Sequence, residues 1–291
     1  MKRILIIALL PLVFVSGCLM KKMTQITEQG EQAFKNNNYV TALNHFEEVI
    51  NTLEERGKRA EGEIYYKAGK AAYQLEKYDK AIGYLEEAEY LKYNHAQMYY
   101  VLAKASKKAD NLSKEIDALE SYVNNHKNGE HYQEMRIRLF ETYIESKNWQ
   151  PAMDLWPRLS KEEQQELREE YLVVNKELEN KEICDQLASE ILEENPKNIE
   201  ALDWMAKKYY WEAENRYQQE MKAYKNNRTR SQYNQLVKAL KVVTRDFKQS
   251  LNHFKTLYNL TESPKYAKFL GNIYARLDDE SKAQYYHKKA E

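Results

Sequence analysis

Pairs of small residues that lie twelve positions apart recur along this chain, and they constrain its fold more than any other feature. The pairs are Gly30 with Ala42, Gly69 with Ala81, and Gly271 with Ala283. Two helices of a hairpin approach closely only where the facing side chains are small, and larger residues fill the gaps beside them. Helical apolar spacings surround each pair, and short polar turns separate the apolar runs. The pattern therefore predicts helical hairpins.

The composition argues against a sheet-rich alternative. The chain has only 8 Gly and 5 Pro in 291 residues, whereas a fold rich in strands needs many turns. We therefore expect an all-α fold.

Two stretches show the hairpin pattern most clearly, and they resemble the tetratricopeptide repeat. They are residues 67–73 with 78–88, and residues 270–274 with 283–286. The repeat of that family has a period of about 34 residues. The resemblance implies a right-handed α-solenoid of about seven degenerate hairpins, and a generic helical bundle is the alternative. The expected hairpins start near residues 23, 62, 96, 133, 165, 199 and 264.

The middle of the chain departs from the repeat pattern. Glu115 stands where a small residue is expected, and three other positions carry residues larger than the family prefers. Those three residues are Phe140, Leu172 and Cys184.

The sixth expected hairpin, at residues 199–263, is about twice the usual length. Helical apolar spacing continues on both sides of a polar, basic break at residues 225–230. This predicts an elongated hairpin, here called the arm, with a basic tip that carries Lys225, Arg228 and Arg230. Residues 264–291 then form a last hairpin of ordinary length.

Charge is distributed unevenly around the arm. Residues 161–200 hold 5 basic and 13 acidic groups, a net of −8, and residues 205–256 hold 12 basic and 4 acidic groups, a net of +8. Neighbouring units could neutralise each other, or both could be solvated faces. Alternatively, the arm presents a positive surface to an acidic partner, a lipid head group or the acidic segment of a second copy.

The N-terminus reads as a secretory signal. Lys2 and Arg3 precede an apolar run of 12 residues at 4–15, which is shorter than the roughly 20 that a membrane-spanning helix needs. Residues 15–18, Val-Ser-Gly-Cys, resemble the lipobox of bacterial lipoproteins. The resemblance implies cleavage after a signal peptide at 1–17 and acylation of Cys18, and an ordinary cleaved signal with a chance cysteine is the alternative.

The same resemblance implies a location and a domain order. Leu19 follows the cysteine, where an aspartate would favour the inner membrane, so we expect the outer membrane. Residues 19–22 lack an acidic run, which favours the periplasmic side. A short tether at 18–22 would then lead into a solenoid over 23–198, ahead of the arm.

Motifs for catalysis or metal binding do not occur in the sequence. Its six His residues form no i, i+4 pair, and there is no phosphate-binding Gly-rich loop, nucleophile elbow or paired-Cys zinc motif. We expect neither enzyme activity nor a cofactor or metal. The 45 basic and 45 acidic residues balance, which gives no case for nucleic acid. If Cys18 is lipidated, Cys184 is the only free thiol, and we expect it to be packed and unreactive.

Candidate binding residues follow from the resemblance, since first helices of tetratricopeptide hairpins line a concave face that binds peptides. On these registers the face offers Tyr66, Lys70 and Tyr73, followed by Tyr100, Lys104 and Lys107. Aromatic rings between ammonium groups suit a peptide with aromatic or acidic side chains. Alternatively, the tyrosines pack against neighbouring helices and the lysines are merely exposed. His126 and His131 fall in an expected loop and should be solvated.

The functional hypothesis is a lipid-anchored, non-enzymatic scaffold that binds a protein or peptide partner in the bacterial envelope. A second hypothesis is a homo-oligomer in which the basic arm docks on residues 161–200 of another copy. A third is a nutrient-binding or glycan-binding lipoprotein.

Overall fold

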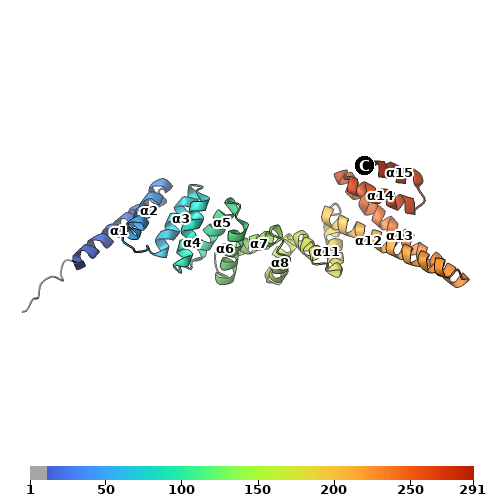
Figure 1. Cartoon of the computed structure of the whole chain (residues 1–291), viewed down its shortest axis with the longest axis horizontal. Helices are drawn as coiled ribbons and strands as arrows, with labels where there is room; N and C mark the ends of the chain where they lie inside the picture. Colours follow the sequence, from blue (N-terminus) through green and yellow to red (C-terminus); the bar gives the residue numbers. More distant parts are fainter. Residues whose placement is uncertain (1–11) are drawn as a thin grey trace, which may run out of the picture. The chain divides into compact units, whose positions relative to one another are not determined.

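The computed structural model describes residues 12–291, which form fifteen α-helices and one 3₁₀ helix without a strand among them. The chain divides into two compact units, Met1–Lys147 and Asn148–Glu291, here called unit 1 and unit 2. Antiparallel hairpins build both units, so the all-α prediction is confirmed. Figure 1 shows the helices within each unit.

Unit 1 contains three hairpins and one further helix, and each helix packs on its neighbours in the chain. The helices are α1 (Leu12–Lys35), α2 (Tyr39–Glu54), α3 (Gly62–Gln74), α4 (Tyr78–Tyr90), α5 (Ala96–Lys108), α6 (Leu112–Asn125) and α7 (Tyr132–Glu145). Polar side chains define several starts: Asn38 Oδ1 accepts a hydrogen bond from the Thr41 backbone N–H at 3.2 Å, and Asn111 caps α6 in the same way.

The glycines of the small-residue pairs lie where another helix crosses. A Cβ on Gly69 would stand 2.7 Å from Cγ of Leu85, and one on Gly30 would stand 2.8 Å from Cε1 of Phe46. Each contacting residue is sixteen positions after its glycine. The expectation that a large residue covers each small one is thus confirmed at these two crossings.

Unit 2 begins irregularly and then continues as hairpins. Its helices are α8 (Trp149–Leu155), the 3₁₀ helix η1 (Trp156–Arg158), α9 (Lys161–Glu166), α10 (Arg168–Glu177), α11 (Lys181–Glu194), α12 (Ile199–Asn226), α13 (Arg230–Thr261), α14 (Pro264–Arg276) and α15 (Glu280–Lys289). The seven-residue α8 ends just before Pro157, which lies in η1, because proline lacks the N–H that a continuing helix would use. The helix expected near residue 165 is divided at Leu167.

The arm consists of α12 and α13, with 28 and 32 residues, joined by a connection at Asn227–Thr229. The elongated hairpin predicted over 199–263 is therefore present. Its base holds the core of unit 2, in which Phe247 and Phe254 are fully buried. In Figure 1 the distal part of the arm, in orange, extends past α14 and α15.

The N-terminal predictions fall largely outside the described residues. Residues 1–11 of the expected signal peptide are not described, and Cys18 is described only by its place in α1. Because α1 runs from Leu12 to Lys35, the segment expected to be a tether at 18–22 is helical. In the described part of the chain no helix combines the length and apolar character that crossing a bilayer requires.

Candidate functional site

An open pocket of about 560 Å³ lies between α1 and α3 on unit 1. Its apolar wall comes from Phe34, Phe46 and Tyr66, and the charged lining includes Lys35 and Lys70. Both helices are the first members of their hairpins, as the sequence predicted for Tyr66 and Lys70. An apolar wall beside ammonium groups can hold an apolar side chain that has an anionic neighbour.

Tyr66 and Lys70 are held in place by aromatic contacts. The Tyr66 ring stacks on Tyr93, with centroids 5.3 Å apart, and burial together with Tyr93 raises the pKa of Tyr66 to about 12. The Lys70 ammonium lies 5.0 Å from the centroid of the Phe34 ring and makes no ion pair in the described residues. One face of Tyr66 is therefore covered, as the packing alternative proposed, while Lys70 keeps an unneutralised charge.

A charged triad closes the other side of this pocket. Lys67 Nζ pairs with Glu31 Oε1 at 2.5 Å and with Glu63 Oε1 at 2.9 Å. Burial disfavours the charged form of Lys67, but hydrogen bonds to both carboxylates outweigh it and raise the pKa. One cation and two carboxylates leave this triad with a net charge of −1, and the unpaired cations of the pocket are Lys35 and Lys70.

The predicted residues of α3 and α5 lie near one another. Burial is the main cause that raises the pKa of Tyr100, the hydrogen bond to Glu134 is the main cause that raises the pKa of Lys104, and Tyr73 adds a smaller contribution to both. Lys104 Nζ in turn donates a hydrogen bond to Glu134 Oε1 on α7 at 3.0 Å. Together with the Phe34–Lys70 contact, these interactions connect α1, α3, α5 and α7 in order. We call the surface of these four helices the first-helix face.

Two histidines expected to be solvated are instead partly buried. The His131 ring stacks on Tyr100 with centroids 3.9 Å apart, and it covers one side of that tyrosine. His126 Nε2 lies 2.9 Å from Asn94 Oδ1, and burial, with a smaller contribution from His95, lowers the pKa of His126. These contacts could not be predicted from the sequence, because they depend on the path of the connections between helices.

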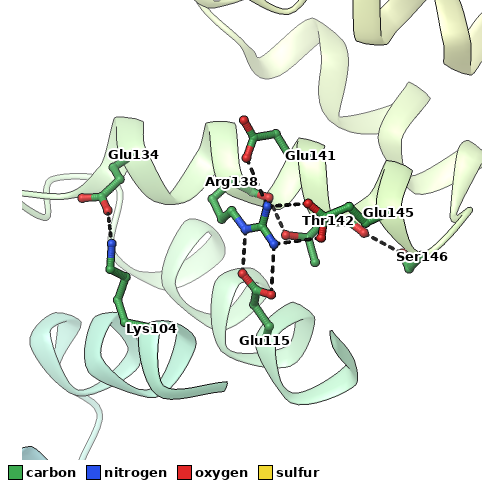
Figure 2. Close-up of polar contacts among 8 residues, drawn as sticks. All are labelled: Lys104, Glu115, Glu134, Arg138, Glu141, Thr142, Glu145 and Ser146. Atoms are coloured by element: carbon green, nitrogen blue, oxygen red, sulfur yellow. Dashed lines mark hydrogen bonds and ion pairs between the residues drawn. The ribbon is translucent and has the colours of Figure 1, made fainter. Parts of the chain in front are cut away.

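A second pocket of about 270 Å³ opens between α5 and α7 and contains the predicted Lys104 and Lys107. At its base Arg138 donates five hydrogen bonds, one from each N–H, to three carboxylates (Figure 2). Nε lies 2.7 Å from Glu115 Oε1, and Nη1 lies 2.7 Å from Glu145 Oε1. The third carboxylate belongs to Glu141.

This network explains the glutamate that breaks the repeat pattern. The Glu115 side chain is 3% exposed and that of Arg138 is 14% exposed, so the pair is largely removed from water. The hydrogen bond from Arg138 is the main cause that lowers the pKa of Glu145, and Lys107 adds to it. Arg138 was not among the residues predicted from the sequence. A buried glutamate indicates that a cation lies nearby, but not which one.

The arm-tip residues predicted for binding belong to unit 2, whereas the first-helix face belongs to unit 1. Lys225, Arg228 and Arg230 are exposed at the end of the arm in unit 2. Beside them, the rings of Tyr224 and Tyr233 lie 6.0 Å apart.

A pocket of about 520 Å³ between α11 and α12 was also not predicted from the sequence. Trp204 Nε1 donates to Asp185 Oδ1 at 2.8 Å, and Lys208 Nζ lies 2.7 Å from Asp185 Oδ2. Trp211, one heptad after Trp204, is 52% exposed. Two tryptophans seven residues apart on one helix were the available signal.

The thiol of Cys184 is fully buried, and burial raises its pKa to about 11. A high pKa keeps a thiol protonated and slow to react. Across residues 12–291, no group of three or more His, Cys, Asp or Glu side chains is placed to hold a metal ion.

No protein-family model and no curated protein matches the chain. Solved structures of other proteins do match the chain. A tetratricopeptide repeat protein from Parabacteroides merdae has a TM-score of 0.43 and 11% identity, and the match covers 93% of this chain and 92% of that one. The C-terminal part of a TPR repeat-containing protein from Cytophaga hutchinsonii has a TM-score of 0.46 and 18% identity, with 91% and 93% covered. A TPR repeats protein from Bacteroides fragilis has a TM-score of 0.36 and 14% identity, and the match covers 87% of this chain and 98% of that one. These similarities concern helical architecture alone.

Proposed function

We propose that the chain is a non-enzymatic scaffold that holds a protein partner through the first-helix face of unit 1. In this proposal the partner contributes an extended segment with an apolar or aromatic side chain next to a carboxylate. The apolar group enters the pocket between α1 and α3, and the carboxylate meets Lys70. This follows the peptide-binding role that the tetratricopeptide resemblance implies.

The observation that carries the proposal is the unneutralised cations along this face. Lys35 and Lys70 border the first pocket and Lys107 the second, and none of the three has a carboxylate partner within 4 Å among the described residues. Nearby lysines on the same face, such as Lys67 and Lys104, are paired. An anionic segment that spans both pockets would meet free cations at each end.

The location is proposed with the function. Acylation of Cys18 would tether the chain to the bacterial outer membrane on its periplasmic side, and the support is the lipobox-like sequence at residues 15–18. Several acyl chains give stable anchoring, where one chain alone is marginal.

Affinity purification from crosslinked membranes tests the proposal, with a Tyr66→Ala, Lys70→Glu variant against wild type. Tyr90→Ala, Lys58→Glu is the matched control, because Tyr90 is 67% exposed on the second helix α4 and Lys58 is exposed outside the first-helix face. Loss of a central interface residue costs about 2 kcal/mol, or roughly 30-fold in affinity. We expect the partner to be lost with the first variant and kept with the control. Equal recovery with both would contradict the proposal.

A further inference from the structure

The exposed face of α13 carries cations and no carboxylate. Its charged residues over the outer two thirds of the helix are Arg230, Lys238, Lys241, Arg245 and Lys248, and all five are exposed. We call these five residues the cationic face. The helix has one acidic residue, Asp246, which is 3% exposed and pairs with Arg245 Nη2 at 2.9 Å.

This one-sided charge distinguishes α13 from the other helix of its hairpin. The partner helix α12 is mixed: it contains five acidic residues and five basic ones, counted along its sequence. An ordinary solvated helix in a chain with 45 groups of each sign would also be mixed. Lys238, Lys241 and Lys248 form no ion pair with another of the described residues. Intramolecular neutralisation therefore accounts for Arg245 but not for the three lysines of the cationic face.

The placement of the five residues indicates the shape of what they contact. At 3.6 residues per turn they fall within an arc of about 80°, and from Arg230 to Lys248 they extend about 27 Å along the axis. Leu236, Val243, Phe247 and Phe254 are buried on the opposite side, against the rest of the hairpin. A broad, nearly straight row of cations on the outside of a projecting rod fits an extended plane of negative charge better than a single narrow pocket.

The other exposed residues near this arc suit the head-group region of a bilayer. Asn234 and Asn252 are exposed and neutral, and they can hydrogen-bond to phosphate or glycerol oxygens. Val237, which is 37% exposed, lies about 20° outside the arc, whereas Tyr233, which is 52% exposed, lies about 60° outside it and faces Tyr224 of α12.

We propose that the cationic face of α13 adsorbs to a bilayer surface that contains anionic phospholipid. The buried apolar side of α13 stays in the hairpin, so the contact is electrostatic and at the surface. It adds a second membrane contact to the anchor proposed at Cys18, and it does not depend on a peptide binding to unit 1. Because the lysines lie within a Debye length of about 10 Å from such a surface at 0.1 M salt, high salt would release them.

Vesicle flotation of the full chain tests this proposal. Vesicles of phosphatidylcholine alone are compared with vesicles that contain 30% phosphatidylglycerol, so that any contribution from the N-terminus is present in both. Lys238→Gln, Lys241→Gln, Lys248→Gln is the test variant. Lys58→Gln, Lys108→Gln, Lys127→Gln is the control, because it makes the same change of net charge at exposed lysines of unit 1.

Wild type and control should partition more strongly onto the anionic vesicles. Each juxtamembrane lysine is worth about a fivefold change in partition, so the test variant should lose on the order of 100-fold of that preference. Thermal unfolding should be unchanged, since the three lysines are exposed and unpaired. The proposal is overturned if wild type does not distinguish the two vesicles, or if the test variant keeps the preference of the control. A cationic face that ignores lipid but is needed to crosslink an acidic protein would also overturn it, in favour of that partner.

Discussion

Replacement of Arg138 by Met should destabilise unit 1 more than replacement of its buried partner Glu115 by Gln. Met keeps the apolar stem but removes the guanidinium, so the carboxylate of Glu115, whose side chain is 3% exposed, loses its cation. Breaking a buried pair from one side typically costs about 3–5 kcal/mol. Glu115→Gln leaves Arg138 bonded to Glu145 and Glu141, both at least 41% exposed, and should cost about 1–2 kcal/mol.

The double replacement Arg138→Met, Glu115→Met separates burial of an unpaired charge from loss of packing. With both charges gone, two apolar side chains fill the site. The double variant should therefore be destabilised by at least 2 kcal/mol less than Arg138→Met alone. Urea unfolding followed by far-ultraviolet circular dichroism measures these differences. At a slope of about 2 kcal/mol per molar urea, Arg138→Met should lower the midpoint of unit 1 by roughly 2 M.

The chain provides an internal control for this measurement. All 4 tryptophans lie after residue 147, in unit 2, so their fluorescence follows unit 2 while circular dichroism follows both units. The account would be refuted if Arg138→Met cost less than about 1 kcal/mol, or if the double variant were no more stable than Arg138→Met.

Three further predictions follow from the described contacts. Gly69→Ala should destabilise the chain by about 1–2 kcal/mol because its Cβ would stand 2.7 Å from a leucine. Gly83→Ala, whose Cβ would have nothing within 4 Å, should stabilise the chain by about 0.5–1 kcal/mol. Thermal melts of the two variants check the contrast, and equal shifts in melting temperature would contradict it. Burial opposes the charged form of Asp203, but hydrogen bonds from two lysines outweigh it, so folding lowers the pKa of Asp203. The carboxylate therefore stabilises the fold above its unfolded pKa, and this stabilisation is lost as pH falls through the folded pKa. Asp203→Asn should therefore cost about 2 kcal/mol at pH 7 and progressively less below pH ~4, as urea unfolding followed by tryptophan fluorescence would show; a pH-independent difference would argue against this pair. In a Cys18→Ser chain, Cys184 should react with a thiol reagent only upon unfolding, because burial raises its pKa to about 11; rapid labelling of the folded chain would contradict its burial.

The positions of the hairpins could be predicted from the sequence because the signal for them is local. Expected starts at 62, 96, 199 and 264 coincide with the first residues of α3, α5, α12 and α14. Each start depends on apolar spacing, a polar turn and a small residue that admits the next helix, and all of these lie within about 40 residues. The division of the helix near Leu167 carried no comparable signal.

The candidate site could be predicted in part. The residue types on the first helices follow from the repeat register, so Tyr66 and Lys70 lie together as expected. Which lysines remain free could not be predicted, because pairing depends on distances between helices far apart in sequence: Lys104 meets Glu134, thirty residues later, while Lys70 meets only aromatic rings on that face. Arg138 was missed for the same reason.

Site-specific photocrosslinking in living cells locates the partner on the surface of the chain. A benzophenone amino acid would replace Tyr73 or Tyr100, which lie on the first-helix face and leave its free lysines in place, and Tyr90, which is 67% exposed on the second helix α4. We expect one and the same protein to crosslink from positions 73 and 100 and not from position 90. Crosslinks to that protein from position 90 alone, or the absence of any protein crosslink from positions 73 and 100, would contradict a scaffold that binds its partner through this face.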